Sequence, residues 1–553
     1  MTNYEKLAHL IFPDVTKTIL DLETIFPKRD LEESAMVTRF APSPTGFLHT
    51  GSLFASLVSW RFAKQSNGVF FVRLEDTDQK REIEGSGAKV LEEMKLFGIN
   101  PDESFVIGGN YGPYVQSERK WIYDIVIKHF IEIGLAYPCF CTHEELDEIR
   151  TKQEALKLNP GYYGEFALCR KLSVSELISR VEEGHPYVIR FKSPGDENQK
   201  VAVDDLIRGH IEFPENVQDI VIMKTDGLPT YHFAHLVDDH FMRTTHVTRG
   251  EEWMSSVPIH LQLFDSINWK RPIYCHLPVI MKLDEGKRRK LSKRKDPEAS
   301  VKYFLEKGYP IEGFLEYLMT IANTNFEEWR IEHPHANLFD FELTFQKMSL
   351  DGALFDIEKV NSISKECLGK MTSLVIASNA YAWANENDEL ELLQVIRQDP
   401  DYFESILNIE RGTEKPRKDY AKYSDILPVI DFMYDDYYSK FIQEPLPFNE
   451  RYSKTLLIYI LELFLSRPAL DLPEEEWFLN LKELAESCDF AARPKDYKKN
   501  PDAYLGHIGD FAEIIRIAVS GRKNTPNFYY VLKILTLKKV KERIQKVISL
   551  LQD

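Results

Sequence analysis

The chain has 553 residues, of which 43% are hydrophobic and 12% aromatic, enough to build several well-packed domains. Its formal net charge of −18 at pH 7 argues against a protein that binds nucleic acid nonspecifically. Six cysteines in so long a chain exclude a secreted disulfide scaffold and favour reduced thiols. The apolar runs are too short to span a membrane and the first residues lack a signal-peptide pattern, so we expect a cytoplasmic protein without membrane contact.

The first predicted elements follow a short charged extension at residues 1–35. A buried strand is predicted at 37–40, and after a loop a helix is predicted at 53–65. Val69 to Leu74 forms a second strand, whose near-continuous apolar character is typical of a parallel sheet buried on both faces. This order is a βαβ unit, so we predict an α/β fold with a doubly wound parallel sheet of the Rossmann type, its first half at 36–136.

The chain changes character at residues 137–226, where a charged helix and further strand candidates suggest an α+β insertion. Apolar segments at 220–224 and 245–250 are consistent with the second half of the parallel sheet, and we place the second half of the α/β domain at 227–359. Nearly every later segment is an amphipathic helix, including 425–442. We therefore expect a separate all-helical region at 360–553.

The loop after the first predicted strand, RFAPSPTGFLHTGS at residues 39–52, is suited to hold a phosphate. In a parallel sheet such a loop faces the ligand crevice, next to the free N–H groups of the following helix. Gly46 and Gly51 permit close approach of the backbone, and His49 can donate a hydrogen bond at the rim. The loop matches neither G-x-G-x-x-G nor the P-loop, so by itself an ordinary connection is the simpler interpretation.

A second element suited to phosphate lies at residues 287–295, KRRKLSKRK, where seven of nine residues are basic. Lys290 and Lys293 stand three apart around Ser292. Taken alone, this cluster predicts a basic surface loop. Two such elements in one chain indicate a phosphate site more strongly than either does alone. The acidic net charge does not exclude such a site, because phosphates respond to the local field more than to the net charge.

FLHTGS resembles the HIGH signature and KLSKR the KMSKS signature of class I aminoacyl-tRNA synthetases. Within that class, six motifs in the same order resemble the glutamyl-tRNA synthetases, and the resemblance runs from residue 36 to 359. The motifs are RFAPSPTGFLHTG, VRLEDTD, GPYVQSER, GLPTYHFAHLVDDH, THVTRGEEW and KLSKR. The APSPTG form differs from the related glutaminyl enzymes, which typically show PEPNG there.

The resemblance implies that the enzyme activates glutamate with ATP and Mg²⁺ and transfers it to the 3′ end of tRNA(Glu). It implies catalytic roles for His49, Lys290, Ser292 and Lys293, and nucleotide binding by these lysines and His49 together with Gly46 and Gly51. The implied glutamate pocket consists of Arg39, Ala41, Ser43, Glu75, Tyr231, His235 and Arg249. Arg39 and Arg249 can form paired hydrogen bonds with carboxylates, and Glu75 can bind the ammonium group of the substrate. His235 departs from the family, which often has asparagine at that place.

The insertion resembles the family's acceptor-end domain, and the helical region resembles the bacterial-type anticodon-binding domain. The resemblance also implies that 227–359 holds the second half of the catalytic domain and the stem-contact region. Some relatives hold zinc in the insertion through C-x-C and a later C-x-H. Here Cys139, Cys141 and Cys169 are present, but Lys171 stands where histidine would ligate. Lysine is a poor zinc ligand, so we expect buried structural thiols and no metal. We also expect a monomer.

Four alternatives remain beside a glutamyl enzyme. The protein could be an enzyme of relaxed specificity that also charges tRNA(Gln), or a related glutaminyl enzyme. It could be a noncatalytic paralogue that binds tRNA, although such a protein would not need the predicted nucleotide and amino-acid pockets. A small-molecule adenylyltransferase with the same signatures would be a compact single domain, which fits poorly with the helical region.

Overall fold

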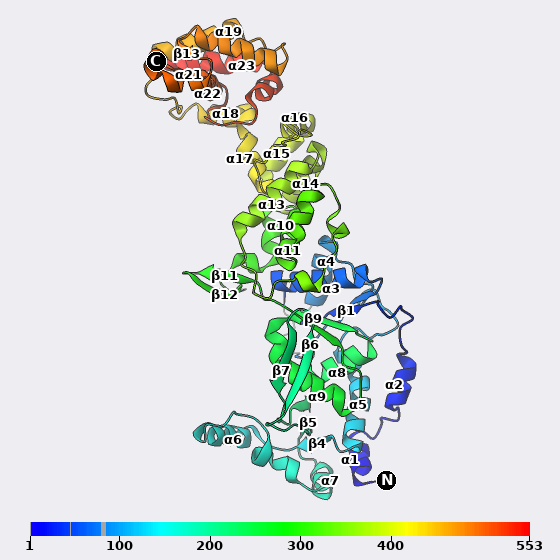
Figure 1. The fold of residues 1–553 in the computed structure, drawn as a ribbon. Coiled ribbons are helices and arrows are strands. Elements are labelled where there is room, and N and C mark those ends of the chain that lie inside the picture. The colour runs from blue at the N-terminus through cyan, green and yellow to red at the C-terminus, as the bar shows by residue number, and fades with distance from the viewer. Residues whose placement is uncertain (1, 45, 79–84, 293, 553) are drawn as a thin grey trace. The chain divides into compact units, whose positions relative to one another are not determined.

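A computed structural model describes residues 2–44, 46–78, 85–292 and 294–552 of the chain (Figure 1). The chain divides into two compact units. Unit 1 comprises Met1–Tyr303 and Leu318–Asp356, and unit 2 comprises Phe304–Tyr317 and Ile357–Asp553. Within the described ranges, no helix has both the length and the apolar character needed to cross a membrane.

A parallel sheet lies at the centre of unit 1, as predicted. Strands β1 (Val37–Phe40), β2 (Val69–Val72) and β3 (Glu103–Ser104) form one part, and β9 (His246–Gly250) pairs with β10 (Ile273–Leu277) in the other. The Thr245 N–H donates to the Val37 carbonyl at 3.0 Å, which joins the two parts. The order is therefore β3-β2-β1-β9-β10, in which the winding direction reverses beside the first strand and leaves a ligand crevice at the carboxyl ends.

Helices cover both faces of this sheet because successive residues of a strand point to opposite sides. Thr38 Oγ1 donates to the Ser59 carbonyl of α3 (Thr50–Gln65) at 2.8 Å. Its neighbour Val37 lies in a buried cluster with residues of α5 (Lys120–Glu132) and α8 (Tyr231–Phe241). The predicted βαβ unit is thus confirmed. Further helices in the first 356 residues include α4 (Ser86–Leu96), α9 (Val257–Ser266), α10 (Val301–Lys307), α11 (Ile311–Ala322) and α12 (Phe326–Glu332).

Between α5 and α8 the chain forms an α+β segment. It contains an antiparallel sheet, a hairpin and two helices, which are β4 (Ala136–Cys139), β5 (Val188–Phe191), β8 (Val221–Met223), β6 (Lys200–Asp205), β7 (Gly209–Pro214), α6 (His143–Ala155) and α7 (Val174–Glu182). The assignment of 220–224 to the parallel sheet is wrong, because β8 pairs antiparallel with β5. A short apolar run identifies a buried strand but not its partner.

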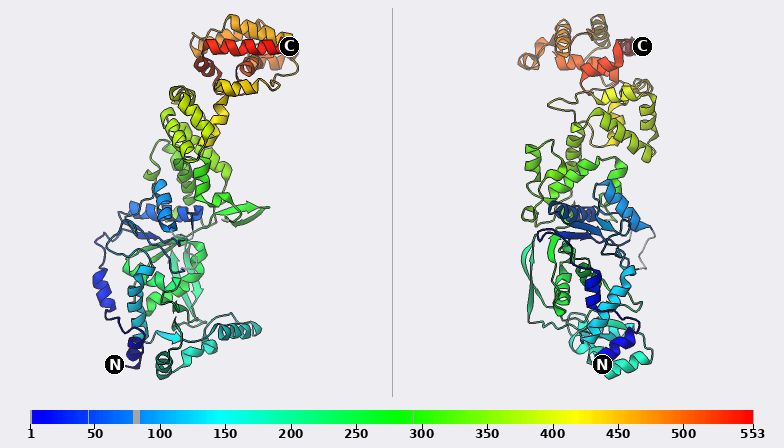
Figure 2. Two further views of the ribbon diagram at one scale, coloured as in Figure 1. Left: turned by 180° about the vertical axis from the view of Figure 1, so that it is seen from behind. Right: turned by 90° about the vertical axis from the view of Figure 1, so that its right-hand side faces the viewer.

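The first 35 residues are an integral part of unit 1. Helix α1 (Asn3–Ile11) packs on α5 and α7, and α2 (Ile19–Ile25) packs on α5 (Figure 2). Arg29 then makes two parallel bonds of 2.8 Å to the Glu103 carboxylate at β3. This segment therefore ties the inserted region to the parallel sheet.

Unit 2 is helical, as predicted. Its helices from residue 357 onward are α13 (Ile357–Lys370), α14 (Ser373–Glu386), α15 (Leu390–Gln398), α16 (Pro400–Leu407), α17 (Ile426–Ile430), α18 (Asp435–Phe441), α19 (Lys454–Ser466), α20 (Glu474–Glu486), α21 (Pro494–Lys499), α22 (Ile508–Ser520) and α23 (Phe528–Gln552). A two-residue pair, β13 (Phe490–Ala491) and β14 (Gly506–His507), accompanies them. The helix expected at 425–442 is broken between α17 and α18, where Arg543 donates to the Phe432 carbonyl at 2.8 Å and so replaces a helical bond.

Candidate functional site

A cavity of about 730 Å³ opens at the carboxyl ends of β1, β2 and β9 in unit 1. The loop after β1, the start of α8 and the end of β12 (Lys287–Lys290) complete its wall. Most predicted site residues line it, namely Arg39, Ala41, Ser43, Gly46, His49, Gly51, Glu75, Tyr231, Arg249, Lys290 and Ser292. His235 does not line the cavity, and Lys293 lies outside the described residues.

The loop after β1 presents the amino end of α3 to the cavity. His49 caps this helix, and its Nδ1 accepts a hydrogen bond from the Gly51 N–H at 3.0 Å. The neutral ring therefore carries its proton on Nε2. Gly46 has φ of 124°, which is favourable only for glycine. The Leu48 N–H donates to Glu93 of α4 at 2.7 Å, which fixes the loop against that helix.

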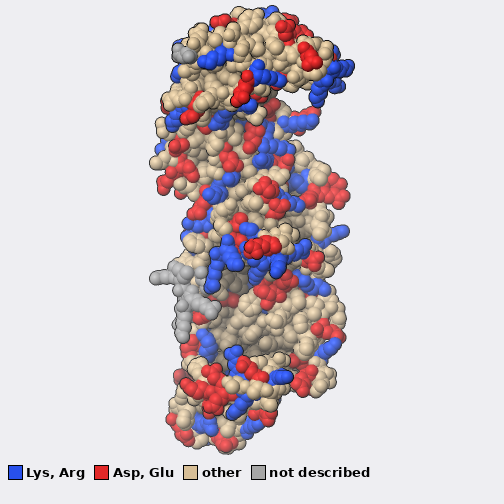
Figure 3. Space-filling model, turned by 90° about the vertical axis from the view of Figure 1, so that its left-hand side faces the viewer, with Lys and Arg blue, Asp and Glu red and all other residues tan. Residues whose placement is uncertain are grey.

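A hairpin of β11 (Met281–Asp284) and β12 carries the basic cluster. Lys290 Nζ lies 2.7 Å from Glu252 Oε1, and these side chains are 55% and 43% exposed. The Ser292 N–H donates to Asp296 at 2.8 Å, and Arg289 makes two bonds to the same carboxylate, which lower its pKa. Lys and Arg side chains gather beside a hollow at the level of this hairpin (Figure 3), so the local charge is positive despite the acidic composition.

A network of buried charges lies behind the cavity. Arg39 Nε is 3.2 Å from Asp239 Oδ1, and Arg73, which is fully buried, donates to the same oxygen at 3.0 Å and to Glu75 at 3.2 Å. Burial raises the pKa of Glu75, although the neighbouring arginines oppose that shift. Asp239 and Arg73 fall within the motifs VRLEDTD and GLPTYHFAHLVDDH, but neither was singled out by sequence, because local spacing does not show which charges pair.

Arg249 has a different environment. Its Nε donates to His276 Nε2 at 3.0 Å, and its Nη1 donates to the Tyr231 hydroxyl at 3.2 Å and to His260 Nδ1 at 3.3 Å. Its Nη2 donates to the Trp253 carbonyl at 3.3 Å. All four acceptors are neutral groups, and no carboxylate among the described residues forms an ion pair with Arg249. Neither histidine belongs to the residues predicted from the motifs.

His235 lies behind the wall of the cavity rather than in it. It is 1% exposed, its Nδ1 is 2.8 Å from Asp239, and its Nε2 is 3.0 Å from the Tyr274 hydroxyl. Burial lowers its pKa to about 4, against the effect of the nearby carboxylate. At neutral pH this side chain is therefore an uncharged ring that contacts Asp239 and Tyr274.

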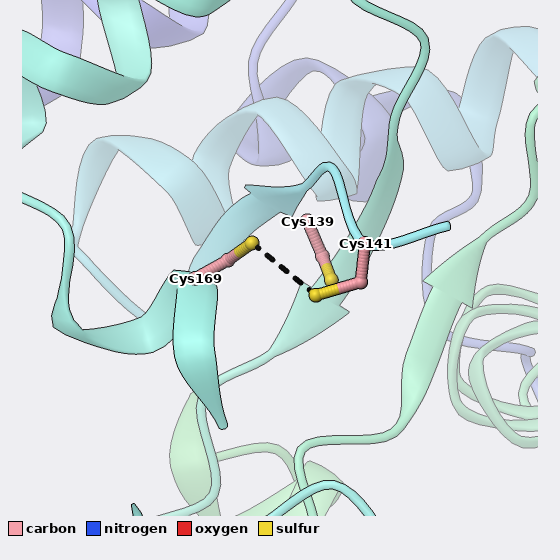
Figure 4. Close-up of side chains that lie close together, drawn as sticks. All are labelled: Cys139, Cys141 and Cys169. Atoms are coloured by element: carbon pink, nitrogen blue, oxygen red, sulfur yellow. Dashed lines mark hydrogen bonds between the residues drawn. The ribbon is translucent and has the colours of Figure 1, made fainter. Parts of the chain in front are cut away.

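A second cluster lies in the inserted region, where Cys139, Cys141 and Cys169 bring their Sγ atoms within 4.8 Å of one another (Figure 4). The hydroxyl of Tyr162 is 3.4 Å from Cys139 Sγ and 3.2 Å from Cys141 Sγ. Hydrogen bonds from the other two thiols lower the pKa of Cys139, which favours the thiolate that binds metals. Lys171 donates to the Glu165 carbonyl at 3.0 Å instead of joining the cluster.

Residues 35–358 match the family described as tRNA synthetases class I (E and Q), catalytic domain. The glutamate–tRNA ligase of Acetivibrio thermocellus is 45% identical over 550 residues, covering 99% of this chain and 100% of that protein. That of Clostridium perfringens is 46% identical over 553 residues, covering 99% and 100%. The crystal structure of a glutamate tRNA ligase from Elizabethkingia meningosepticum in complex with its amino acid is similar, with a TM-score of 0.76, 28% identity, and coverage of 93% of this chain and 99% of that one.

Proposed function

Because the chain belongs to the class I tRNA synthetases of the E and Q type, we propose that it is a glutamate–tRNA ligase. The observation that carries this proposal is Arg249, a cation at the cavity wall whose four bonded acceptors are all neutral. Such a cation favours an amino acid with an anionic side chain, because a neutral amide would leave the charge uncompensated. The full-length relatives named glutamate–tRNA ligase support the same conclusion.

The proposed reaction has two steps. The α-carboxylate of glutamate attacks the α-phosphorus of ATP, an O–P bond forms, and pyrophosphate leaves. A hydroxyl of the terminal tRNA adenosine then attacks the carbonyl carbon of the adenylate, and AMP leaves. Since the carboxylate is already a nucleophile, the residues mainly align the reactants and stabilise charge on phosphate oxygens.

Arg249 binds the side-chain carboxylate in this proposal, and Glu75 binds the ammonium. Arg39, Ala41, Ser43 and Tyr231 complete the amino-acid pocket, while His235 supports it from behind. The amino end of α3, with Gly46, His49 and Gly51, faces the ATP phosphates. Lys290 and Ser292 stabilise them from the other side, and Mg²⁺ bound to ATP adds positive charge there. The family resemblance gives Lys293 the same role in charge stabilisation.

From the family resemblance, we propose that residues 137–226 bind the acceptor end of tRNA(Glu) and that residues 360–553 bind its anticodon. The catalytic domain halves at 36–136 and 227–359 belong to the same assignment. A monomeric state and a cytoplasmic location stay predictions.

The cysteine cluster fits a structural zinc ion better than the sequence suggests. Tyr162 offers the fourth donor that Lys171 cannot supply, so three thiols and one phenol are available for a tetrahedral ion. We therefore propose that Cys139, Cys141, Cys169 and Tyr162 hold zinc. The ion would supply no chemistry to the reaction and would tie β4 to the segment at 162–169.

Charging assays test the proposed function directly. Purified total tRNA is incubated with the protein, ATP, Mg²⁺ and labelled glutamate or, separately, labelled glutamine. We expect transfer of glutamate. Transfer of both amino acids would identify an enzyme of relaxed specificity, and transfer of neither by folded protein would identify a noncatalytic paralogue.

A further inference from the structure

Arg249 is held from two sides by histidine rings that come from different elements. On β9 and β10, Arg249 and His276 stand opposite each other in the parallel register, so their side chains share one face of the sheet. His260 approaches from α9. Arg249, His276 and His260 are 6%, 1% and 0% exposed, so these contacts are shielded from water.

The tautomer of His276 is fixed by its second partner. Its Nδ1 lies 2.7 Å from Asp205 Oδ2 at the end of β6, and its own backbone N–H donates to the same carboxylate at 3.0 Å. Asp205 also accepts from the backbone N–H groups of Ile207 and Arg208, both at 2.9 Å. The proton of His276 therefore sits on Nδ1, and the Nε2 lone pair is directed at Arg249.

His260 is oriented in the same way, by a second series of hydrogen bonds. Its Nδ1 accepts from Arg249, so its Nε2 carries the proton, and this nitrogen lies 3.0 Å from His232 Nδ1. Both ring nitrogens of His260 are thus used. Each histidine offers Arg249 a lone pair and no compensating charge.

Arg39, in the same cavity, shows what this arrangement avoids. Arg39 forms an ion pair with Asp239, and Asp239 also forms an ion pair with Arg73. An arginine paired in this way gives a carboxylate ligand less electrostatic stabilisation than an arginine held by neutral acceptors.

We propose that His276 and His260 are positioning residues that hold Arg249 in a cage of neutral acceptors, so that its whole positive charge faces the side-chain carboxylate of the substrate. This inference rests on the proposed function. Asp205 acts one step further out, through His276. The pKa of His276 and that of His260 are both lowered, chiefly by burial, which agrees with neutral rings.

Two substitutions at His276 separate positioning from packing. In asparagine the amide lies on Cγ, near the place of Nδ1, so His276→Asn keeps a bond to Asp205 and loses the acceptor for Arg249. In glutamine the amide lies one atom further out, so His276→Gln keeps the acceptor near the place of Nε2. We expect His276→Asn to raise the KM for glutamate by about 10- to 100-fold, by analogy with the loss of residues that support metal ligands. His276→Gln should stay within about threefold of the wild type.

The assay is tRNA charging with glutamate and ATP varied separately, with thermal unfolding of each variant as a check on folding. The KM for ATP should change by less than about twofold in both variants, since the cage does not touch the phosphate side of the cavity. His260→Leu should raise the glutamate KM in the same selective way.

Equal glutamate KM values for the two His276 variants, or a parallel rise in the ATP KM, would overturn the cage while leaving the ligase assignment intact. A wild-type protein that transfers glutamine but not glutamate would overturn the ligase assignment itself, and with it the cage as an anion site. The two failures are therefore distinguishable in one set of assays.

Discussion

Arg39 and Arg249 are both buried arginines at the wall of one cavity, yet their partners differ in charge. Arg39 is paired with the Asp239 carboxylate, whereas the acceptors around Arg249 are histidine rings, a hydroxyl and a carbonyl. Coulomb interactions are strong where water is excluded, so the partner decides how much positive charge reaches the cavity. The two arginines can therefore contribute differently to recognition despite their similar positions in the motifs.

Arg249→Lys should raise the KM for glutamate by roughly 10- to 100-fold. Lysine keeps the charge but lacks the planar fork, and charge-assisted hydrogen bonds contribute about 1.5–3 kcal/mol each. The measurement is charging at varied glutamate. Arg271→Lys, at a surface pair with Asp265, serves as the matched control and should leave the KM unchanged. An unaltered KM in Arg249→Lys would contradict the pocket assignment.

Lys290→Ala should lower the rate of ATP–pyrophosphate exchange, measured in the presence of tRNA, by about 10²- to 10³-fold, as when one preorganised donor to developing charge is removed. The melting temperature should hardly change, because the Lys290–Glu252 pair is exposed and such pairs contribute about 0–1 kcal/mol. Glu252→Gln removes the same pair without removing the lysine and is the control. Full activity in Lys290→Ala would exclude this residue from the mechanism.

Ion pairs connect the end of strand β2 with helix α8. Arg73 bonds to Asp239 and Glu75 and lies 3.4 Å from Asp238, and Arg119 bonds to Asp238 at 2.6 Å. These side chains are buried, and each charge is offset by another. These ion pairs hold β2 and α8 in a fixed relative position, which also fixes the positions of Arg39 and Glu75.

Arg73→Met should lower the free energy of unfolding by about 3–5 kcal/mol, because it removes the buried cation that Asp238, Asp239 and Glu75 share and leaves their negative charge only partly compensated. Urea unfolding at neutral pH measures the effect. Arg150→Met is the control, since the Arg150–Glu154 pair on α6 is 67% and 53% exposed and its loss should cost less than about 1 kcal/mol. Equal effects of the two substitutions would show that the buried network contributes nothing.

The inserted region depends on its cysteine cluster. The protein, purified without chelator, should contain about one zinc ion per chain, and Cys169→Ser should lose it, because three remaining donors hold zinc poorly. Cys275→Ser, at a buried thiol of β10 outside the cluster, should keep the metal. Metal analysis by mass spectrometry decides, and wild-type protein without zinc would return the cluster to the free thiols expected from sequence.

The two units should respond differently to acid, because every histidine except His507 lies in unit 1. Burial lowers the pKa of His232, His235 and His240 from 6.5 to about 4. Between these values the unfolded chain binds protons that the folded unit does not, so acid favours unfolding. We therefore expect the contribution of these histidines to the stability of unit 1 to be fully present above pH 6.5 and to be lost as the pH falls toward 4.

Between pH 6.5 and 5, the free energy of opening unit 1 should fall by up to about 1.4 kcal/mol per pH unit for each such histidine, while unit 2 changes less. Amide hydrogen exchange reports the two units separately. His240→Gln, which removes one of these rings, should reduce the slope for unit 1. Parallel acid sensitivity in both units would contradict this account.

The candidate site contains residues that the sequence motifs identified and others that only the structure revealed. The resemblance of the motifs to the family identified eleven residues that line the cavity. The fold brings them together because each of these motifs follows the carboxyl end of a strand or begins a helix. The resemblance did not identify Asp239, His276, His260 or Tyr162. Nothing local marks these residues, since their importance comes from the side chain that they meet.

The sequence by itself determined β1, α3, the parallel sheet and the helical second unit, because periodicity and strand-ending loops are set by neighbours along the chain. The tertiary structure decided the rest. It paired β8 with β5 instead of the parallel sheet, and it broke the expected helix at 425–442. It also neutralised Arg39 with a carboxylate and left Arg249 among neutral rings. Buried hydrogen bonds and charges must be satisfied by whatever side chains packing brings near, and that proximity is not encoded in local spacing.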